Sequence, residues 1–291
     1  MWNNRLLSSK QFTPELLNSF FNLADAIQVD KNLVFGNANG KILCTWFNQP
    51  STRTKLSFQT AMLRLGGQYI DFQEDLSSIA KGESIEDTAR MLNNYCDILV
   101  VRHSDENIFN KILPYLEIPV INAGNGNDEH PTQALIDLYT IWKHFGYYEP
   151  LTYLVCGNSS RTIRSLCFSL CDKNSKVIFV VNEGEYLDDD IENDLYKQGV
   201  YYQTVNDLRH YSNIDVIYAN RDQGTAEDNI IYPSYLDHSS YTSENAILLH
   251  PLPRVYEIHP SVDVHPKAKY FLQASYAVPV RMAILGMMLG L

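Results

Sequence analysis

The stretch Pro50-Ser51-Thr52-Arg53-Thr54 decides the fold, because it joins an apolar run at 42–47 to a segment at 55–65 whose apolar residues recur at helical spacing. This order predicts a strand, a turn and a helix. The first helical turn presents unpaired N–H groups, and an arginine fork can hold two phosphate oxygens, so the turn is a candidate phosphate pocket. The plainer alternative is a helix cap, in which the hydroxyls only satisfy backbone donors. The lack of a Gly-rich loop and of Gly-Lys-Ser/Thr argues against a nucleotide-type P-loop.

The composition predicts a cytoplasmic globular protein. The 291 residues, 45% hydrophobic and 20% charged, suit two domains of roughly 130 to 150 residues. The net charge of −11 argues against a nucleic-acid or membrane partner, so an anion site must be built from a few converging Arg and Lys. The five cysteines form no Cys-x-x-Cys pair, which argues against zinc and disulfides. The N-terminus lacks an apolar signal segment, and no uninterrupted apolar run reaches the ~18 residues that span a bilayer.

Polar residues follow further predicted strands in the first half of the chain. After a helix at 13–28 and a strand at 67–72, the polar loop at 76–83 leads into a helix. A buried-strand pattern at 97–103 includes Arg102 near its carboxyl end, where parallel sheets collect ligands. His130-Pro131-Thr132-Gln133 opens a helix that runs to about 145, with His130 and Gln133 on one face. Each feature has a plainer explanation, as a solvated loop, a surface charge or a helix cap.

The second half repeats the alternation. We expect strands at 151–156, 176–181 and 215–219 with helical stretches between them, and a helix that starts near Arg161. Arg221 follows the third strand, and the acidic run at 188–190 reads as a solvated helix start. A strand at 246–249 leads into His250-Pro251-Leu252-Pro253-Arg254, where the prolines orient backbone carbonyls. An amphipathic helix is expected at 273–291. The absence of Gly-x-Gly-x-x-Gly argues against a dinucleotide site.

Six separated motifs resemble, in order, those of the aspartate and ornithine carbamoyltransferases. They are Ser-Thr-Arg-Thr with the following Lys-Leu-Ser-Phe, Ser-Ser-x-x-Lys-Gly-Glu at 77–83, the strand-end Arg102, His-Pro-x-Gln at 130–133, the arginines 161 and 221 with Gln223, and His-Pro-Leu-Pro-Arg at 250–254. The last motif has the aspartate form, since ornithine enzymes characteristically carry Cys in place of Pro251. The resemblance implies an α/β fold of two doubly wound parallel-sheet domains joined by interdomain helices. Residues 1–133, completed by the helix 275–291, would bind carbamoyl phosphate, and residues 134–274 would bind aspartate.

The same resemblance assigns the site residues. Carbamoyl phosphate would be bound by Ser51, Thr52, Arg53, Thr54, Ser77, Lys81, Arg102, His130, Gln133, Pro251 and Leu252. Aspartate would be bound by Lys81, Arg161, Arg221, Gln223, Pro251 and Leu252. The catalytic set would be Arg53, Thr54, Lys81, Arg102, His130 and Gln133. Ser77 and Lys81 are expected to reach the neighbouring subunit of a homotrimer. No cofactor or metal is implied, and a regulatory chain or a dihydroorotase partner is left open.

The chemistry agrees with these assignments. Carbamoyl phosphate is a reactive mixed anhydride, so the protein needs to bind a dianion, polarise a carbonyl and place an amine, without a covalent nucleophile. Thr54, Arg102 and His130 would donate to the developing oxyanion, and the departing phosphate would take the proton. Two arginines suit a dicarboxylate and disfavour the cationic side chain of ornithine. The alternatives are a carbamoyltransferase for another amino acid, such as ornithine, and a catalytically silent carbamoyl-phosphate-binding subunit.

Four departures from the family pattern bear on the site. Asn125-Gly126 replaces a usual Asp-Gly, which removes a carboxylate close to His130. Asn158 stands where relatives commonly have Asp, and the connection 223–250 is short, so we expect the aspartate-side loops to move or close differently. Ser275-Tyr276-Ala277 replaces a more usual Asn-Gly turn.

Overall fold

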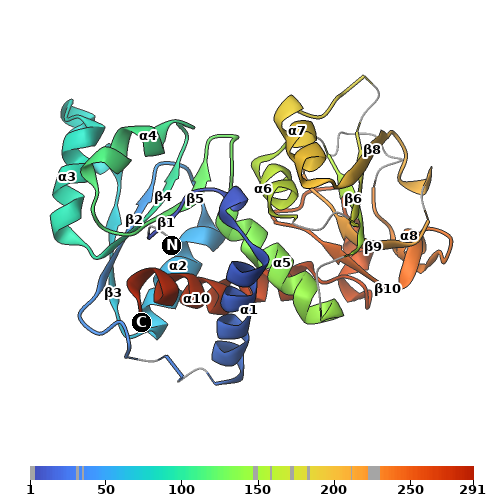
Figure 1. Ribbon diagram of the computed structural model, residues 1–291, viewed down its shortest axis with the longest axis horizontal. Helices are drawn as coiled ribbons and strands as arrows, with labels where there is room; N and C mark the ends of the chain where they lie inside the picture. The colour runs from blue at the N-terminus through green and yellow to red at the C-terminus, as the bar shows by residue number, and fades with distance from the viewer. Residues whose placement is uncertain are drawn as a thin grey trace. The chain divides into compact units, whose positions relative to one another are not determined.

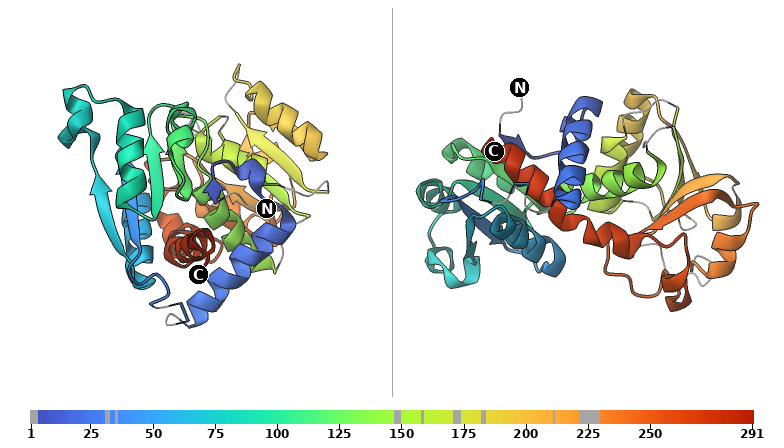
Figure 2. Two further views of the ribbon diagram at one scale, coloured as in Figure 1. Left: turned by 60° about the vertical axis from the view of Figure 1, so that its left-hand side comes forward. Right: turned by 90° about the horizontal axis from the view of Figure 1, so that it is seen from below.

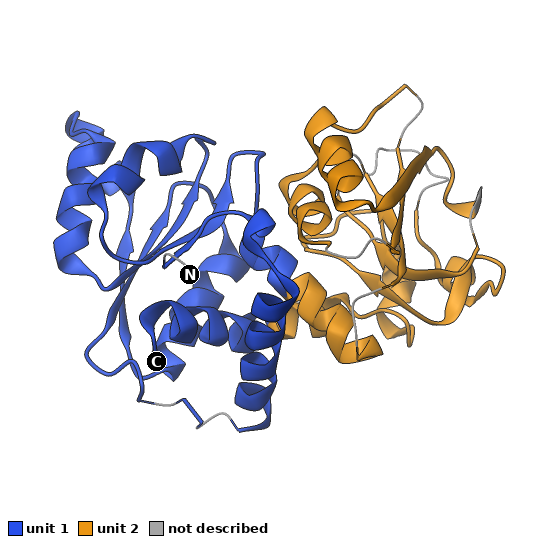
Figure 3. Ribbon diagram, in the orientation of Figure 1, with its two compact units in different colours: residues 1–135, 277–291 blue, residues 136–276 orange. Residues whose placement is uncertain are grey.

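A computed structural model describes residues 4–30, 33–34, 36–146, 150–157, 159–170, 174–181, 184–210, 212–221 and 230–291. The chain divides into two compact units, residues 1–135 with 277–291, and residues 136–276 (Figure 3). Each unit contains one five-stranded sheet in which every strand pair is parallel. The predicted α/β fold with two parallel sheets is confirmed.

The sheet of unit 1 has the strand order β1-β5-β4-β2-β3. Residues 98–101 of β4 are buried, as expected for a central parallel strand covered on both faces. Phe47 at the end of β2 lies opposite Arg102 near the end of β4. The strands are β1 (Arg5–Leu6), β2 (Ile42–Phe47), β3 (Gln68–Phe72), β4 (Ile98–His103) and β5 (Val120–Asn125).

Helices cover this sheet, and α10 packs against α1 and α2 (Figures 1 and 2). The helices are α1 (Pro14–Val29), α2 (Thr52–Arg64), α3 (Ile85–Tyr95), α4 (Ile108–Ile112) and α10 (Ala277–Leu289), with short 3-10 helices at Ser9–Gln11, Glu74–Leu76, Ser78–Lys81 and Leu113–Tyr115. The expected amphipathic helix at 273–291 was wrong in pattern. Helices α9 and α10 occupy this range, and α10 is buried on most sides, with α1 and α2 packed against it.

The sheet of unit 2 has the order β10-β9-β6-β7-β8. Its strands are β6 (Thr152–Cys156), β7 (Lys176–Val180), β8 (Tyr201–Val205), β9 (Ile214–Tyr218) and β10 (Thr242–Leu249). Its helices are α5 (Pro131–Phe145), which begins in unit 1, α6 (Arg161–Ser169), α7 (Asp189–Gln198), α8 (Pro233–Asp237) and α9 (Tyr270–Ser275), with 3-10 helices at Leu208–His210 and Pro260–Val264. The acidic run at 188–190 does start a helix. The edge strand β8 was missed, since only helical stretches were expected between 181 and 215.

Both sheets share one winding. In unit 1 the chain runs from β2 outward to β3, and then returns to place β4 and β5 on the other side of β2. In unit 2 it runs from β6 to β7 and β8, and then returns to place β9 and β10 on the other side of β6. Ligands of open α/β sheets bind at the carboxyl ends of strands where the winding reverses. The two switch points are therefore at β2/β4 and at β6/β9.

One described stretch, Tyr270–Leu289, is long and apolar enough to cross a membrane. Of its most apolar window, 61% is buried inside the structure, as is usual for the core helix of a globular protein. This stretch is therefore weak evidence for a membrane span.

Candidate active site

The switch point of unit 1 gathers the residues predicted to hold phosphate. Strands β5, β4 and β2 are neighbours in the sheet, and their carboxyl ends lead to His130, to Arg102 and to residues 51–54. The backbone N–H of Asn48, just after β2, donates to the carbonyl oxygen of Arg102 at 2.9 Å. Residues up to 79 positions apart in the sequence are thereby brought to one edge of one sheet.

The first turn of α2 is open for a ligand. Ser51 stands at the N-cap position, but its side chain makes no capping hydrogen bond, so the plainer explanation of this hydroxyl as a helix cap does not hold. Thr52 and Arg53 are exposed side chains. The guanidinium of Arg53 is nevertheless partly removed from water, which lowers its pKa. Thr54 is 6% exposed, on the buried side of the turn. The first turn of α2 thus combines an N-cap hydroxyl that makes no capping bond with the exposed residues Thr52 and Arg53.

The His130 imidazole lies between two hydroxyl groups. Its Nε2 is 3.5 Å from Thr54 Oγ1, and its Nδ1 is 3.4 Å from Thr132 Oγ1. The His130 carbonyl oxygen accepts from the backbone N–H of Gln133 at 2.9 Å, which confirms that α5 begins here. His130 is 4% exposed, whereas Gln133 is half-buried. The structure therefore joins Thr54 and His130 in one cluster and places Gln133 one turn away.

A buried arginine lies behind this cluster. Arg281 of α10 is 1% exposed, and its Nη1 donates to the Ser57 hydroxyl. Ser57 Oγ in turn lies 3.1 Å from the carbonyl oxygen of Thr54, so α10 braces the first turns of α2. Burial, with the nearby charge of Arg102, lowers the pKa of Arg281 to about 9. Arg281 lies within the helix expected at 273–291, but no role was predicted for it.

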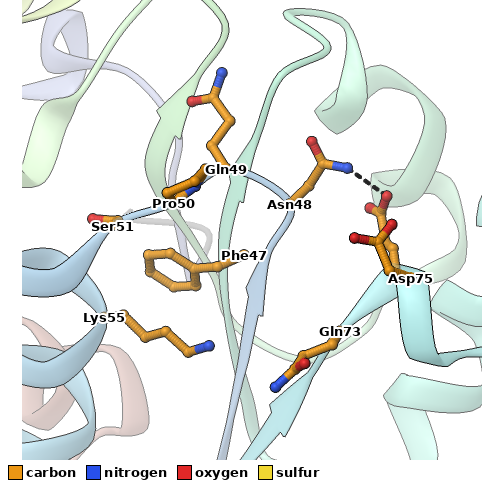
Figure 4. A pocket seen from close by; sticks show the side chains of 9 residues that line it. Phe47, Asn48, Gln49, Pro50, Ser51, Lys55, Gln73 and Asp75 are labelled. Carbon is orange, nitrogen blue, oxygen red and sulfur yellow. Dashed lines mark hydrogen bonds between the residues drawn. The ribbon is translucent and has the colours of Figure 1, made fainter.

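A polar pocket of about 280 Å³ lies beside the mouth of α2 (Figure 4). Ser51 and Lys55 line it on the helix side, and Asn48, Glu74 and Asp75 line it on the other. Groups of both signs share this pocket, because the lysine stands opposite two carboxylates.

Ser77 and Lys81 lie in the segment after β3. The Ser77 hydroxyl donates to the Glu74 carbonyl oxygen at 2.8 Å and accepts from the Ile79 N–H at 3.1 Å. Lys81 is exposed at the end of the 3-10 helix Ser78–Lys81. Ser77 is thus fixed locally, while the Lys81 ammonium is open to solvent.

The switch point of unit 2 carries the two predicted carboxylate-binding arginines. Arg161 is the first residue of α6, after β6, and Arg221 follows the neighbouring strand β9. The residues just before them are hydrogen-bonded to each other, since Asn220 Nδ2 donates to Ser160 Oγ. This bond ties the start of α6 to the end of β9, so the backbone positions of Arg161 and Arg221 each follow a residue of one hydrogen-bonded pair. Burial lowers the pKa of Arg161, whereas Arg221 is exposed.

Two predicted features of this half-site, Gln223 and Asn158, lie outside the described residues. The turn after β10 is described and is held tightly. Leu252 has a φ of 56°, in the left-handed region, and its N–H donates to His250 Nδ1 at 2.7 Å. Pro251 and Leu252 are half-buried, next to the end of β10, which pairs with β9.

Asn125 has a structural role that its usual Asp counterpart could not fill. Its side-chain nitrogen donates to the carbonyl oxygen of Glu106 at 2.8 Å and to a carboxylate oxygen of Asp128 at 2.9 Å, while its oxygen accepts from Asn122 at 2.8 Å. An ionised carboxylate cannot donate. The amide that stands in place of the carboxylate therefore belongs to a hydrogen-bond network that shapes the turn before His130.

Within the described ranges, no group of three His, Cys, Asp or Glu side chains is placed to hold a metal ion. The described cysteines are free and buried: Cys44, Cys96, Cys156 and Cys167.

These features define a two-domain α/β protein with cationic residues gathered at the switch point of each sheet. A family model described as "Aspartate/ornithine carbamoyltransferase, carbamoyl-P binding domain" matches residues 4–143. A second, described as "Aspartate/ornithine carbamoyltransferase, Asp/Orn binding domain", matches residues 149–288. The chain belongs to the aspartate/ornithine carbamoyltransferase family and is an enzyme.

Named relatives resemble the chain over nearly its full length. The aspartate carbamoyltransferase catalytic subunit of Picrophilus torridus is 40% identical, with 99% of each chain covered. The aspartate transcarbamoylase of Trypanosoma cruzi, solved in complex with N-(phosphonacetyl)-L-aspartic acid, has a TM-score of 0.88 at 32% identity and covers 97% of this chain and 94% of its own. The catalytic subunit of M. Jannaschii aspartate transcarbamoylase has a TM-score of 0.88 at 36% identity, with 99% and 98% covered.

Proposed function

We propose that the chain is an aspartate carbamoyltransferase, which transfers the carbamoyl group of carbamoyl phosphate to the amino group of L-aspartate. The products are N-carbamoyl-L-aspartate and phosphate, in an early step of de novo pyrimidine biosynthesis. The observation that carries the proposal is the placement of the Thr54–His130 pair with Arg102 at one switch point, and of Arg161 and Arg221 at the other.

Unit 1 would bind carbamoyl phosphate. The first turn of α2 and the guanidinium groups of Arg53 and Arg102 supply donors and positive charge for the phosphate, as helix N-termini commonly do. Thr54, Arg102 and His130 would donate to the carbonyl oxygen as it becomes an oxyanion, and Gln133 would hold the carbamoyl NH2. Each such donor is worth about 2.7 to 4 kcal/mol in enzymes where one was removed.

Unit 2 would bind aspartate. Arg161 and Arg221 each offer a planar fork that fits a carboxylate, and the Asn220–Ser160 bond keeps their strand ends together. The carbonyls of Pro251 and Leu252 would accept from the α-amino group, with Gln223 and Lys81 as further contacts. Ornithine has one carboxylate and a cationic side chain, so it would leave one arginine facing a positive charge.

No protein base is needed in this mechanism. The attacking amine must lose a proton as the carbon–nitrogen bond forms, and the departing phosphate would accept it. The rate then depends mainly on holding the amine against the carbamoyl carbon, an effect worth up to roughly 7 to 11 kcal/mol in favourable cases.

We further propose a cytoplasmic homotrimer in which Ser77 and Lys81 complete the site of a neighbouring chain. Two observations support this. Lys81 extends into solvent, and β3 is an edge strand with exposed apolar residues on and around it that a second copy would cover. These residues are Leu56, Leu63, Tyr69, Ile70 and Leu76.

The proposed reaction is tested with purified protein, carbamoyl phosphate and either aspartate or ornithine. We expect turnover with aspartate, detected as phosphate release and N-carbamoyl-L-aspartate. Faster turnover with ornithine would replace the proposal by the ornithine alternative. Binding of carbamoyl phosphate without turnover of either amino acid would instead indicate a catalytically silent subunit.

A further inference from the structure

Two buried histidines that the proposed mechanism does not use stand directly beside the site residues. His103 ends β4 and follows Arg102, and His250 comes just after β10 and precedes Pro251. They are 5% and 2% exposed, so neither is a surface residue. One lies in each unit, at the carboxyl edge of each sheet.

Both imidazoles are held in the same way. Nδ1 accepts from the backbone N–H two residues further on, at 2.9 Å from Asp105 N for His103 and at 2.7 Å from Leu252 N for His250. Nε2 lies 2.9 Å from Glu74 Oε1 for His103 and 2.7 Å from Glu257 Oε1 for His250. Because a backbone N–H can only donate, Nδ1 must accept, and Nε2 must carry a proton that it donates to the glutamate.

The first glutamate links three segments of unit 1. Glu74 Oε1 also accepts from Trp46 Nε1 of β2 at 2.6 Å, and its Oε2 accepts from Asn48 Nδ2 at 2.6 Å, a bond drawn in Figure 4. Its carbonyl oxygen accepts from the Ser77 hydroxyl. Glu74 therefore connects the approach to residues 51–54, the end of β4 and the segment that carries Lys81.

The second glutamate holds the turn after β10. Glu257 Oε2 accepts from the backbone N–H groups of Val255 and Tyr256, both at 2.9 Å. On the other side, the backbone N–H of His250 donates to Gln273 Oε1 at 2.9 Å. The Gln273 Nε2 in turn donates to Asp137 Oδ1 of α5 at 2.6 Å. The turn that bears Pro251 and Leu252 is thus fixed at its start, middle and end.

We propose that His103–Glu74 and His250–Glu257 are positioning pairs, the first setting the geometry of the carbamoyl-phosphate half-site and the second that of the aspartate half-site. This inference rests on the proposed function. Neither pair acts on substrate directly. A buried polar pair contributes little net stability compared with apolar side chains of equal volume, but its hydrogen bonds select one geometry. That geometry includes the left-handed backbone of Leu252, which the bond to His250 Nδ1 holds.

Two substitutions at each histidine separate its two bonds. Asparagine places an acceptor near the position of Nδ1 and loses the glutamate, whereas glutamine places a donor near the position of Nε2 and loses the backbone N–H. We expect His250→Gln to raise KM for aspartate about tenfold or more, because the Leu252 N–H loses its partner, while KM for carbamoyl phosphate stays within about twofold. His250→Asn leaves the buried Oε1 of Glu257 without the His250 donor, so it lowers Tm more but raises KM for aspartate less.

The other pair is the matched control. His103→Gln is expected to raise KM for carbamoyl phosphate and to leave KM for aspartate within about twofold. His265 supplies a second control, since its Nδ1 accepts from Lys267 N at 3.1 Å and its Nε2 lies 3.0 Å from Asp237, away from the carboxyl ends of the strands. His265→Gln should change neither KM.

The outcomes are decisive. A fall in Tm at His103 or His250 without the substrate-specific change in KM would overturn the inference and leave both pairs as fold elements only. Equal effects on both substrates would overturn it as well. Glu74→Gln and Glu257→Gln give the same test with a smaller perturbation if a histidine variant does not fold. The wild-type chain is assayed first, so failure of the proposed function appears as absence of aspartate turnover, which rejects both proposals.

Discussion

Unit 1 and unit 2 wind their sheets alike and place charged residues at the same topological position, yet their half-sites are built from different groups. Unit 1 offers a helix N-terminus, hydroxyls and a buried imidazole, with Thr54 and His130 nearly inaccessible. Unit 2 offers two arginines and a turn whose side chains, Pro251 and Leu252, have no polar atoms. We propose that both positions bind an anion. The side chains of unit 1 would activate the bound anion, whereas those of unit 2 would only recognise it.

The largest expected effect is on kcat, from a substitution in the half-site of unit 1. Arg102→Ala removes a proposed donor to the oxyanion and to phosphate, so kcat should fall about 10²- to 10³-fold in steady-state assays. Arg90→Ala is the control, because Arg90 is an exposed residue paired with Asp87 on α3. An unchanged kcat for Arg102→Ala would place the chemistry elsewhere.

The next test asks whether the half-site of unit 1 needs Lys81 from a neighbouring chain. Lys81→Ala and His130→Ala chains should each be nearly inactive. Mixed trimers should regain activity, because one chain's intact His130 meets another chain's intact Lys81. The measurement is activity after dissociation and reassociation, with subunit exchange confirmed by mass. Full exchange without recovery would contradict sharing of sites.

A substitution in the half-site of unit 2 should instead change KM for aspartate. Arg221→Leu removes the proposed charge-assisted contact to aspartate, and such a contact is worth about 1.5 to 3 kcal/mol, so KM for aspartate is expected to rise about 10- to 100-fold. KM for carbamoyl phosphate should hardly move. Equal rises in both constants would erase the distinction drawn between the two units.

The Glu257 carboxylate makes a pH-dependent contribution to stability. Burial raises its pKa, but hydrogen bonds from His250 and from backbone N–H groups outweigh burial and lower the pKa from 4.5 to about 2. Its contribution is therefore present in full above the unfolded pKa and is lost as pH falls toward 2. Glu257→Gln should cost roughly 2 to 4 kcal/mol of unfolding free energy at pH 7 and progressively less below pH 4.5. Urea unfolding at several pH values measures the difference, and a cost independent of pH would show that the charge does not matter.

The smallest effect concerns the turn before His130. Asn125→Asp replaces a donating amide with an acceptor, so we expect a loss of about 1 to 3 kcal/mol in stability without a matching loss of kcat. Urea unfolding and steady-state kinetics on one preparation give both values. A fall in kcat without a loss of stability would contradict this prediction and indicate that residue 125 takes part in catalysis.

The comparison also shows what a sequence can predict. Long apolar strands followed by Ser, Thr or Arg were predictable, because hydrophobic period and strand-end chemistry are local signals. β8 was not, since Tyr201–Val205 is an edge strand with exposed and half-buried positions. The pattern of α10 was misjudged, because burial by several neighbours leaves no polar face for the helical period to show.

The His–Glu pairs lay beyond sequence reasoning for a related reason. His103 and Glu74 are 29 residues apart and His250 and Glu257 are 7 apart, and neither spacing has meaning without the fold. The only usable signal was a histidine at each strand end. From the sequence, Asn125 was interpreted as the loss of a carboxylate, and only its hydrogen-bond partners show what the amide supplies.

A crystal structure of the chain with N-(phosphonacetyl)-L-aspartic acid, a molecule that carries both a phosphonate and two carboxylates, tests the account most directly. We predict the phosphonate at the first turn of α2 and Arg102, and the carboxylates at Arg161 and Arg221. A bound molecule whose phosphonate or carboxylates lie away from these two switch points would contradict the account.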